Sequence, residues 1–202
     1  CNGVLSQSVK DKCLFIIYLI LNNISNKVYA VDNKIEPLKN SIKNIKEYNL
    51  EEKIIPILSD GFKNITQKDF NTITISGMGG ETIKEILSLN DTDATLILEP
   101  NTNQYSLRKF LLLEGYEIVD EIISRDKDFF YFIIKAKRTS QKMNYSDLEL
   151  FFGPILLRNK PQDFIDYLNK YINDLEKNLS KTSSPELLKK IDFYKEALKW
   201  NS

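Results

Sequence analysis

The sequence predicts an α/β fold: a doubly wound parallel sheet, finished by an antiparallel pair of strands and followed by a helical hairpin. Three observations predict it. Short β-rich runs alternate with segments of helical period over residues 1–138. The last two β-rich runs are joined only by Ser124–Asp128, so they must be antiparallel. Residues 161–202 have no strand pattern and no glycine.

The strand–helix alternation gives the elements of the first part in order. Residues 2–6 allow only a short first strand, and β-rich runs predict strands at residues 27–32, 54–58, 70–76, 94–98, 116–123 and 129–137. Apolar residues at helical spacing, or as one apolar run, predict helices at residues 14–23, 36–48, 81–89 and 104–114. Turn-forming residues separate these elements: Asn22-Asn23, Ser59-Asp60-Gly61, Gly77–Gly80, Glu99-Pro100-Asn101 and Gly115. Such alternation predicts helices on both faces of a parallel sheet, the architecture of Rossmann-like methyltransferases.

The last segment predicts an antiparallel pair of helices that resembles a coiled coil. One apolar stripe consists of Phe164, Leu168, Ile172, Leu175 and Leu179, and a second of Leu187 or Leu188, Ile191, Tyr194 and Leu198. Between them, Ser184 is a candidate N-cap and Pro185 lies near the first helical position. Two roles stay open for this hairpin: a packing or dimerisation arm, or an arm that grips a long substrate.

Composition excludes several kinds of chemistry. The chain has 202 residues, with 28 Lys and Arg against 28 Asp and Glu, so a polybasic wrapper of nucleic acid is excluded, although a local basic face is not. Histidine is absent, which removes His-activated nucleophiles and imidazole-bound zinc, and no metal site is expected. The two cysteines, Cys1 and Cys13, are too few to staple a secreted fold.

No apolar run is long enough to span a bilayer. The run from Cys13 to Leu21, with Lys10 and Lys12 before it and small residues after it, leaves a signal peptide conceivable. The α/β pattern that follows favours a cytoplasmic protein.

Ligands of open α/β sheets bind at the carboxyl ends of the strands, so four strand ends are candidate sites. Asp32 could accept the ribose hydroxyls of a nucleoside, or be a surface acid. Asp60-Gly61 could contact a ligand, or be a simple turn. Gly77-Met78-Gly79-Gly80 places three of the seven glycines between a strand and a helix, which allows a ligand to approach the backbone closely. Asn101, after Pro100, presents an amide that donates and accepts.

These strand ends belong to a series of motifs: VYAVD, SDGF, TITISGMGGETI, LILEPN with LRKFL, GYEIVDEI and FFGPILL. In order and spacing the series resembles the bacterial tRNA (adenine-22-N1)-methyltransferase family from about Phe15 to the end of the chain. The resemblance implies a Rossmann-like domain that binds S-adenosylmethionine, a C-terminal helical, coiled-coil domain, and methylation of N1 of an adenine in tRNA. We place the two domains at residues 1–140 and 141–202.

The resemblance also implies roles for single residues. Asp32, with Asn33, would bind the cofactor ribose, and Asp60, with Gly61, the cofactor adenine. Gly77, Met78, Gly79 and Gly80 would line the methionine and target-base side. Asn101 and Asp11 would orient the target adenine as catalytic residues.

The family's first motif is altered in this chain. The family pattern at the end of the first strand reads approximately Asp-Ile-Gly-Ser/Thr-Asp-His, whereas this chain has Gln7-Ser8-Val9-Lys10-Asp11-Lys12, in which only Asp11 matches. Either cofactor binding is lost, or the first residues are not those of the native reading frame.

Binding of tRNA requires local positive charge, and the candidates are Lys135, Lys137, Arg138, Lys142, Arg158 and Lys160. We expect a monomer or a weak dimer through the hairpin. Two alternatives remain open: a non-catalytic Rossmann-like protein that binds RNA, and a small-molecule methyltransferase in which the hairpin is a lid or dimer arm. A dehydrogenase is disfavoured, because no strand is followed by G-x-G-x-x-G.

Overall fold

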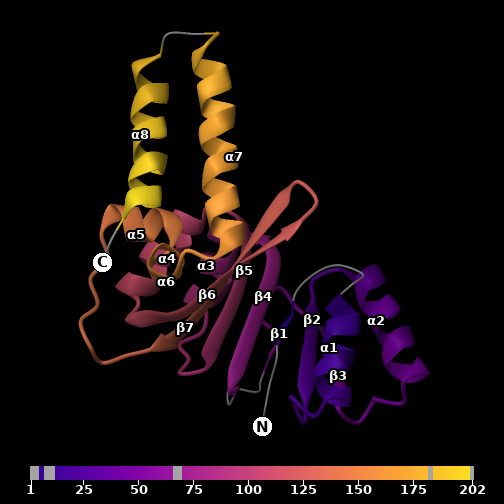
Figure 1. Ribbon diagram of the computed structural model, residues 1–202. Coiled ribbons are helices and arrows are strands. Elements are labelled where there is room, and N and C mark those ends of the chain that lie inside the picture. Colours follow the sequence, from indigo (N-terminus) through magenta and orange to yellow (C-terminus); the bar gives the residue numbers. More distant parts are fainter. Residues whose placement is uncertain (1–4, 7–11, 66–69, 182–183, 201–202) are drawn as a thin grey trace.

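The computed structural model describes residues 5–6, 12–65, 70–181 and 184–200 (Figure 1). The strands are β1 (Leu5–Ser6), β2 (Val28–Asp32), β3 (Ile54–Leu58), β4 (Thr72–Gly79), β5 (Thr95–Thr102), β6 (Tyr116–Asp126) and β7 (Phe129–Arg138). The helices are α1 (Lys12–Leu21), α2 (Ile35–Glu47), α3 (Gly80–Ser88), α4 (Gln104–Leu113), α5 (Asp147–Phe152), α6 (Pro154–Asn159), α7 (Gln162–Leu179) and α8 (Pro185–Lys199). Every helix and strand predicted from the sequence is present, with ends that differ by a few residues.

The strands form two hydrogen-bonded groups that lie next to each other. β1, β2 and β3 are parallel, in that spatial order. In the second group the order is β4, β5, β7, β6, with β4 and β5 parallel and β7 antiparallel to both of its neighbours. β1 lies beside β4, which brings the groups together (Figure 1). The predicted parallel sheet with a final antiparallel pair is therefore confirmed.

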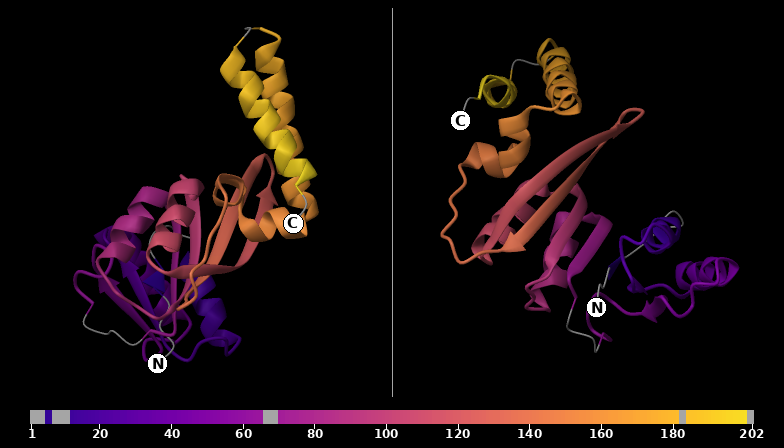
Figure 2. Two further views of the ribbon diagram at one scale, coloured as in Figure 1. Left: turned by 90° about the vertical axis from the view of Figure 1, so that its left-hand side faces the viewer. Right: turned by 60° about the horizontal axis from the view of Figure 1, so that its bottom comes forward.

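Helices cover the sheet on both faces. Ala30 packs with α1 in one hydrophobic cluster, whereas its neighbour Val31 packs with residues of α3 and α4 in another. Because successive side chains of a strand point to opposite faces, α1 and α3 lie on opposite sides of the sheet. In the right-hand view of Figure 2, α1 and α2 (indigo and purple) lie on one side of the strands, and the C-terminal helices (orange and yellow) lie on the other.

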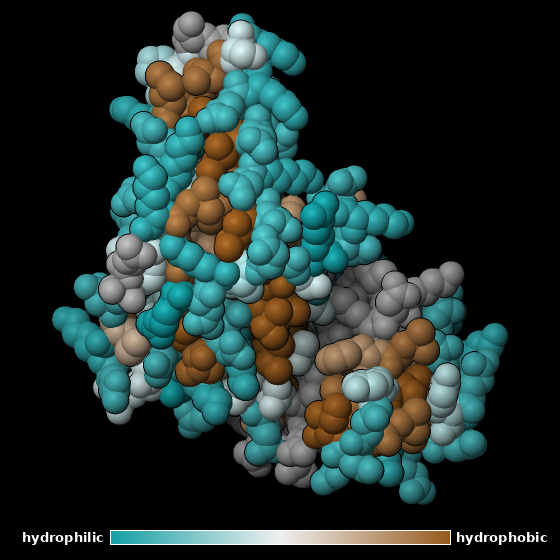
Figure 3. Space-filling model, in the orientation of Figure 1, coloured by the Kyte–Doolittle hydropathy of each residue, from teal (hydrophilic) through white to brown (hydrophobic). Residues whose placement is uncertain are grey.

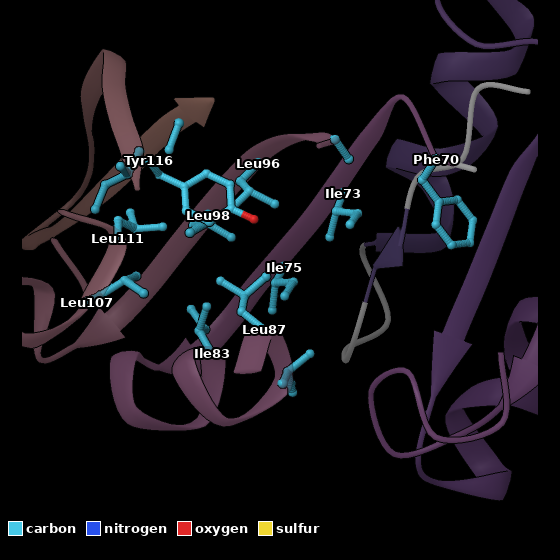
Figure 4. Packing of buried hydrophobic residues seen from close by; sticks show 14 of the residues in the cluster. Phe70, Ile73, Ile75, Ile83, Leu87, Leu96, Leu98, Leu107, Leu111 and Tyr116 are labelled. Atoms are coloured by element: carbon cyan, nitrogen blue, oxygen red, sulfur yellow. The ribbon is translucent and has the colours of Figure 1, made fainter. Parts of the chain in front are cut away.

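The larger cluster, which we name the main core, lies between the sheet and helices α3 and α4. Ile83 and Leu87 of α3, and Leu107 and Leu111 of α4, point toward Ile75, Leu96 and Leu98 of the strands (Figure 4). The helical residues recur three or four positions apart, which puts them on one face. This packing fixes both helices, and with them the strand ends from which they start.

Two strands are longer than the sequence pattern predicts. β4 continues past Ser76 to Gly79 and β5 past Leu98 to Thr102, so Gly77–Gly79 and the Pro100-Asn101 pair lie within strands rather than in loops, and Gly80 begins α3. The strands stay paired because the register shifts twice, between Ser76 and Met78 and between Met78 and Gly79. Such irregularities bend a strand locally and re-aim its side chains.

In the C-terminal part, the described residues form helices α5, α6, α7 and α8, of which the sequence pattern predicts only α7 and α8. Those two pack together into a hairpin that projects from the sheet, and we name this hairpin the arm (Figure 1). In Figure 3 its outer surface is mostly hydrophilic, with hydrophobic atoms along the line where the helices meet. Ser184 caps α8 by accepting a hydrogen bond from Leu187 N. Leu187 packs against the neighbouring hydrophobic cluster whereas Leu188 is half exposed, so Leu187 is the residue that belongs to the apolar stripe of α8.

A second cluster, the arm core, joins the arm to the sheet. It contains Ile123 of β6 and Phe132 of β7 together with residues of α5, α6, α7 and α8. The short helices α5 and α6 lie between the strands and the arm. The domain boundary at residue 140 stays a prediction.

None of the helices in the described ranges combines the length and the hydrophobicity that a membrane span needs.

Candidate active site

The carboxyl ends of β2, β3, β4 and β5 carry the four predicted strand-end motifs, as the topology requires of parallel strands (Figure 1). Asp32 is the last residue of β2 and is 8% exposed. One of its carboxylate oxygens, Oδ1, accepts a hydrogen bond from Lys34 N at 2.8 Å, and its backbone oxygen accepts one from Ser59 N at 2.9 Å. The Asp32 carboxylate is therefore held in one orientation, while Asn33 beside it is exposed.

The end of β3 is built around a tight turn. Gly61 has φ +59°, and a Cβ there would lie 3.2 Å from two atoms of Ile86. Glycine is thus required by both backbone conformation and space. The Asp60 carboxylate forms an exposed ion pair with Lys63 at 2.6 Å, so this acid is accessible to a ligand.

The glycine run brings the ends of β4 and β5 into close contact. A Cβ on Gly80 would lie 2.6 Å from Asn103 O, and one on Gly79 would lie 3.2 Å from Thr102 Oγ1. Gly77 has φ +71°, and Met78 packs against the main core. The run therefore has a packing role at Gly80, in addition to any role in ligand binding.

Asn101 lies on the exposed end of β5, beside the glycine run. The chain then turns sharply into α4 through Asn103, whose φ is +58°. The Gln104 side-chain amide donates a hydrogen bond to Pro100 O at 3.1 Å and closes the turn. An exposed amide on a rigid turn is suited to recognising the hydrogen-bonding edge of a base.

A polar contact ties the first turns of α3 and α4 together. Lys84 Nζ donates to Ser106 Oγ and to Glu81 Oε2, each at 2.8 Å. The hydrogen bond from Lys84, followed by that with Ser106, lowers the pKa of Glu81 below its usual value. The two helices that start at the candidate site thus form one unit.

Asp11, the other predicted catalytic residue, lies outside the described residues, as does the altered motif from Gln7 to Lys10, while Lys12 begins α1. Within the described ranges, no group of three Cys, Asp or Glu side chains lies close enough to hold a metal ion.

Two of the six candidate RNA-binding cations have partners within the chain. The Arg138 guanidinium pairs with Asp91, donates to Glu114 O at 3.1 Å, and lies 4.7 Å from the Tyr116 ring centroid. Lys160 donates to the backbone oxygens of Leu198 and Trp200 at the end of α8.

The other four cations differ in exposure. Lys137, Lys142 and Arg158 are exposed, and Lys135 is half-buried in register with Asp120. Because β7 is antiparallel to β5, Lys137 lies near the start of β5, at the edge of the sheet opposite to Asn101. The sequence pattern predicted that the last two strands are antiparallel to each other but not which of them pairs with β5, so it could not indicate this placement.

Sequence analysis missed one buried ion pair near this site. Arg108 of α4 and Glu121 of β6 have fully buried side chains, and Arg108 Nε lies 2.7 Å from Glu121 Oε1. Arg108 is part of LRKFL, between Leu107 and Leu111 of the main core, so its place on the buried face of α4 was readable from the helical spacing.

Comparison with known proteins places these features in a family. The family model TrmK, tRNA (adenine(22)-N(1))-methyltransferase, matches residues 10–202. The tRNA (adenine(22)-N(1))-methyltransferase of Bacillus subtilis (strain 168) is 26% identical over 184 residues, which cover 87% of this chain and 76% of that protein.

Solved structures give the same result. TrmK of M. capricolum, in complex with S-adenosyl-homocysteine, is 26% identical with a TM-score of 0.84, covering 98% of this chain and 91% of that one. A Streptococcus pneumoniae structure with S-adenosyl-L-methionine is 28% identical with a TM-score of 0.85, covering 98% and 92%. A Streptococcus agalactiae protein of the NADB-Rossmann superfamily is 32% identical with a TM-score of 0.84, covering 98% and 91%.

Proposed function

The chain belongs to the TrmK family of tRNA (adenine(22)-N(1))-methyltransferases, and we propose that it transfers a methyl group from S-adenosylmethionine to N1 of adenine 22 in tRNA. Members of this family carry out this methylation. The observation that carries the proposal for this chain is the buried Asp32 carboxylate, held by Lys34 N at the same sheet edge as the glycine run and Asn101.

The described residues fit the cofactor. Carboxylates accept hydrogen bonds from both hydroxyls of a ribose, and Asp32 lies at the strand end where such a group binds in open α/β sheets. We propose that Asp32 and Asn33 hold the ribose, and that Asp60 and Gly61 contact the adenine of the cofactor. Gly77–Gly80 would line the methionine side, since glycine has no side chain to keep a ligand away from the backbone.

The proposed chemistry requires positioning rather than a protein nucleophile. When bound, S-adenosylmethionine supplies a methyl group that its sulfonium already activates. Adenine N1 carries an in-plane lone pair at neutral pH, so the absence of histidine from the chain is no obstacle. Asn101, and Asp11 in the undescribed segment, would hold the base so that N1 is aligned with the methyl group. The base must leave its stack first, because N1 lies on its Watson–Crick edge.

We further propose how the chain meets tRNA. Lys135, Lys137, Lys142 and Arg158 would contact phosphates away from the reacting base, and binding should weaken steeply with salt. Arg138 and Lys160 are left out of this set because Asp91 pairs with Arg138 and the backbone oxygens of Leu198 and Trp200 hold the Lys160 ammonium in place. The arm would pack as an antiparallel coiled coil in a monomer or weak dimer, and the protein would act in the cytoplasm, where its substrate is.

The cofactor assignment is tested by titration calorimetry with S-adenosylmethionine on the chain, on Asp32→Ala, and on Asp174→Ala as the matched control. Asp174 is an exposed acid of α7, far along the arm from the strand ends. Loss of charge-assisted hydrogen bonds should weaken binding by roughly ten- to a hundred-fold for Asp32→Ala. The control should bind like the parent chain, and equal affinity of both variants would refute the role of Asp32.

Activity is tested by mass spectrometry of 1-methyladenosine in a tRNA transcript, with a transcript that carries G at position 22 as control. Methylation of the first transcript alone is expected. Binding of tRNA without methylation would instead support the alternative that the altered motif at Gln7–Lys12 favours, a relative that binds RNA but does not catalyse.

A further inference from the structure

The pair formed by Arg108 and Glu121 lies where the sheet, α4 and the helices below the arm meet. Both side chains are completely buried, and Arg108 Nε lies 2.7 Å from Glu121 Oε1. Among the buried side-chain atoms of the described residues, Arg108 Nη2 alone lacks a hydrogen-bond partner. Burial of two charges is costly, and an apolar pair of similar volume is often as stable or more so. Stability alone is therefore a weak reason for this pair.

The pair holds the junction between α5 and α6 through the backbone. Arg108 Nη1 donates to the oxygens of Leu150 and Phe151, at 3.1 and 2.9 Å, in the last turn of α5. Glu121 Oε2 accepts a hydrogen bond from Ile155 N, at 3.0 Å, in the first turn of α6. The two charged side chains thus satisfy backbone groups on both sides of the break between these helices.

The break itself is shaped to admit the carboxylate. Gly153 separates α5 from α6 with φ +102°, and a Cβ there would lie only 2.5 Å from Glu121 Oε2. Any other residue at this position would displace the carboxylate or the backbone. The Gly153-Pro154 pair and Glu121 are therefore parts of one arrangement, although they lie far apart in the sequence.

The same helix that carries Arg108 also carries the candidate base-recognition turn at its start. α4 begins three residues after Asn101, and Asn103 O lies against Gly80. A second contact supports the first turn of α4 on α5, because Tyr105 Oη donates to Asp147 Oδ1 at 3.1 Å. A continuous series of contacts thus connects the glycine run, the Asn101 turn, α4 and α5.

We propose that the Arg108–Glu121 pair is a positioning device, which fixes the arm in one orientation relative to Asn101. The pair holds α5 and α6, and these helices pack against α7 and α8 in the arm core. Of the two roles left open for this hairpin, the grip for a long substrate would then present a tRNA with its target base at the carboxyl edge of the sheet. This inference rests on the proposed function.

The test replaces the pair by apolar residues of similar size, in the double variant Arg108→Met/Glu121→Leu. No buried charge is left unpaired, but Leu150 O, Phe151 O and Ile155 N lose their hydrogen bonds, so the melting temperature should fall modestly and by less than in a variant that removes one charge alone. Affinity for S-adenosylmethionine should be unchanged. The kcat for tRNA methylation should fall roughly ten- to a hundred-fold, because a small misplacement of the reacting base is enough for such a loss, while KM for tRNA changes little.

The matched control is Lys195→Met/Glu176→Leu, which removes an exposed ion pair of the same 2.7 Å length within the arm. This variant should keep both kcat and melting temperature. The single variant Arg108→Met should melt at a lower temperature than the double variant, because it leaves Glu121 buried without a partner.

A second readout is independent of catalysis: the distance between spin labels at Lys177→Cys on α7 and Lys43→Cys on α2, with Cys1 and Cys13 replaced. The distance distribution should broaden in the double variant and stay narrow in the control. An unchanged distribution, or a kcat equal to that of the parent chain, would overturn the proposal. If the parent chain itself methylates no tRNA, the proposed function fails, and the label distances alone decide whether the pair fixes the arm.

Discussion

The main core and the arm core of this chain are filled by different types of side chain. Between the sheet and helices α3 and α4, the main core is mostly aliphatic, with Ile73, Ile75, Leu96 and Leu98 completely buried. The arm core is richer in aromatic rings: those of Phe152 and Tyr194, for example, lie 4.9 Å apart, nearly perpendicular. Aliphatic side chains can pack in many relative orientations. Edge-to-face aromatic rings and buried polar groups, in contrast, restrict the orientation of the helices and strands that carry them.

The difference matches the task of each region. The main core only has to hold helices against a sheet whose register is set by backbone hydrogen bonds. Among the described residues, the arm forms no such backbone bonds to the sheet strands, so its direction depends on side chains at its base, including Tyr167, whose ring lies 5.1 Å from that of Phe132 in β7. Orientation is therefore specified by rings and polar contacts where backbone pairing is absent.

The largest effects should come from matched cavities in the two cores. Leu98 in β5 and Leu168 in α7 are both completely buried, so replacing either by Ala should lower the free energy of unfolding by about 2–5 kcal/mol. Hydrogen exchange should separate them. Leu168→Ala should remove protection from α7 and α8 while β4 and β5 remain protected, whereas Leu98→Ala should weaken protection throughout. Equal loss of protection in both variants would show that the two cores unfold as one unit.

An intermediate effect is expected at the contact between β4 and β5. Gly80→Ala would place a Cβ against the rigid backbone at Asn103 and should destabilise the chain by about 1–3 kcal/mol. Gly79 is the matched control: its φ of −67° suits any residue, and of the described residues only the Thr102 hydroxyl would lie close to a Cβ there. Gly79→Ala should stay within about 1 kcal/mol of the parent chain. Urea titration measures both, and equal losses would contradict the close packing at Gly80.

The smallest effect should appear at alkaline pH and in the arm first. Burial raises the pKa of both Tyr167 and Tyr194, which are hydrogen-bonded to each other. The folded state keeps these protons while the unfolded state loses them above about pH 10, so this stabilisation is present below that pH and declines above it.

Circular dichroism during an alkaline titration should therefore show loss of helix before loss of sheet. Tyr167→Phe removes one of the two ionising groups, and its arm should persist to higher pH. An arm that melts at the same pH in both proteins would exclude Tyr167 as the cause.

Sequence periodicity predicted the sheet, its helices and the arm because each has a regular apolar stripe, such as Ile83, Ile86 and Leu87 in α3. It failed for α5 and α6, which are six residues each and too short to show a period. It ended β5 at Leu98, since Pro100 reads as a breaker, although the strand continues.

The candidate site was predicted in part. Asp32 and Asn101 fall at strand ends, as the alternation of strands and helices requires. The pairing of Arg108 with Glu121, and the use of Arg138 for contacts within the chain, depend on residues distant in sequence that meet only in the folded state. Contacts between residues so far apart in the sequence leave no periodic pattern in the local sequence from which they could be predicted.

The arm can also be considered as a lever. α7 has 18 residues, and at about 1.5 Å per residue it extends ~27 Å from the base at which α5 and α6 are held. A rotation of about 10° at that base would move the far end by roughly 5 Å, more than the ~3 Å length of a hydrogen bond. A small rotation of the arm at its base, beside Gly153, would therefore produce a much larger displacement at its far end. Contacts made at that end would be sensitive to rotations that hardly move the base.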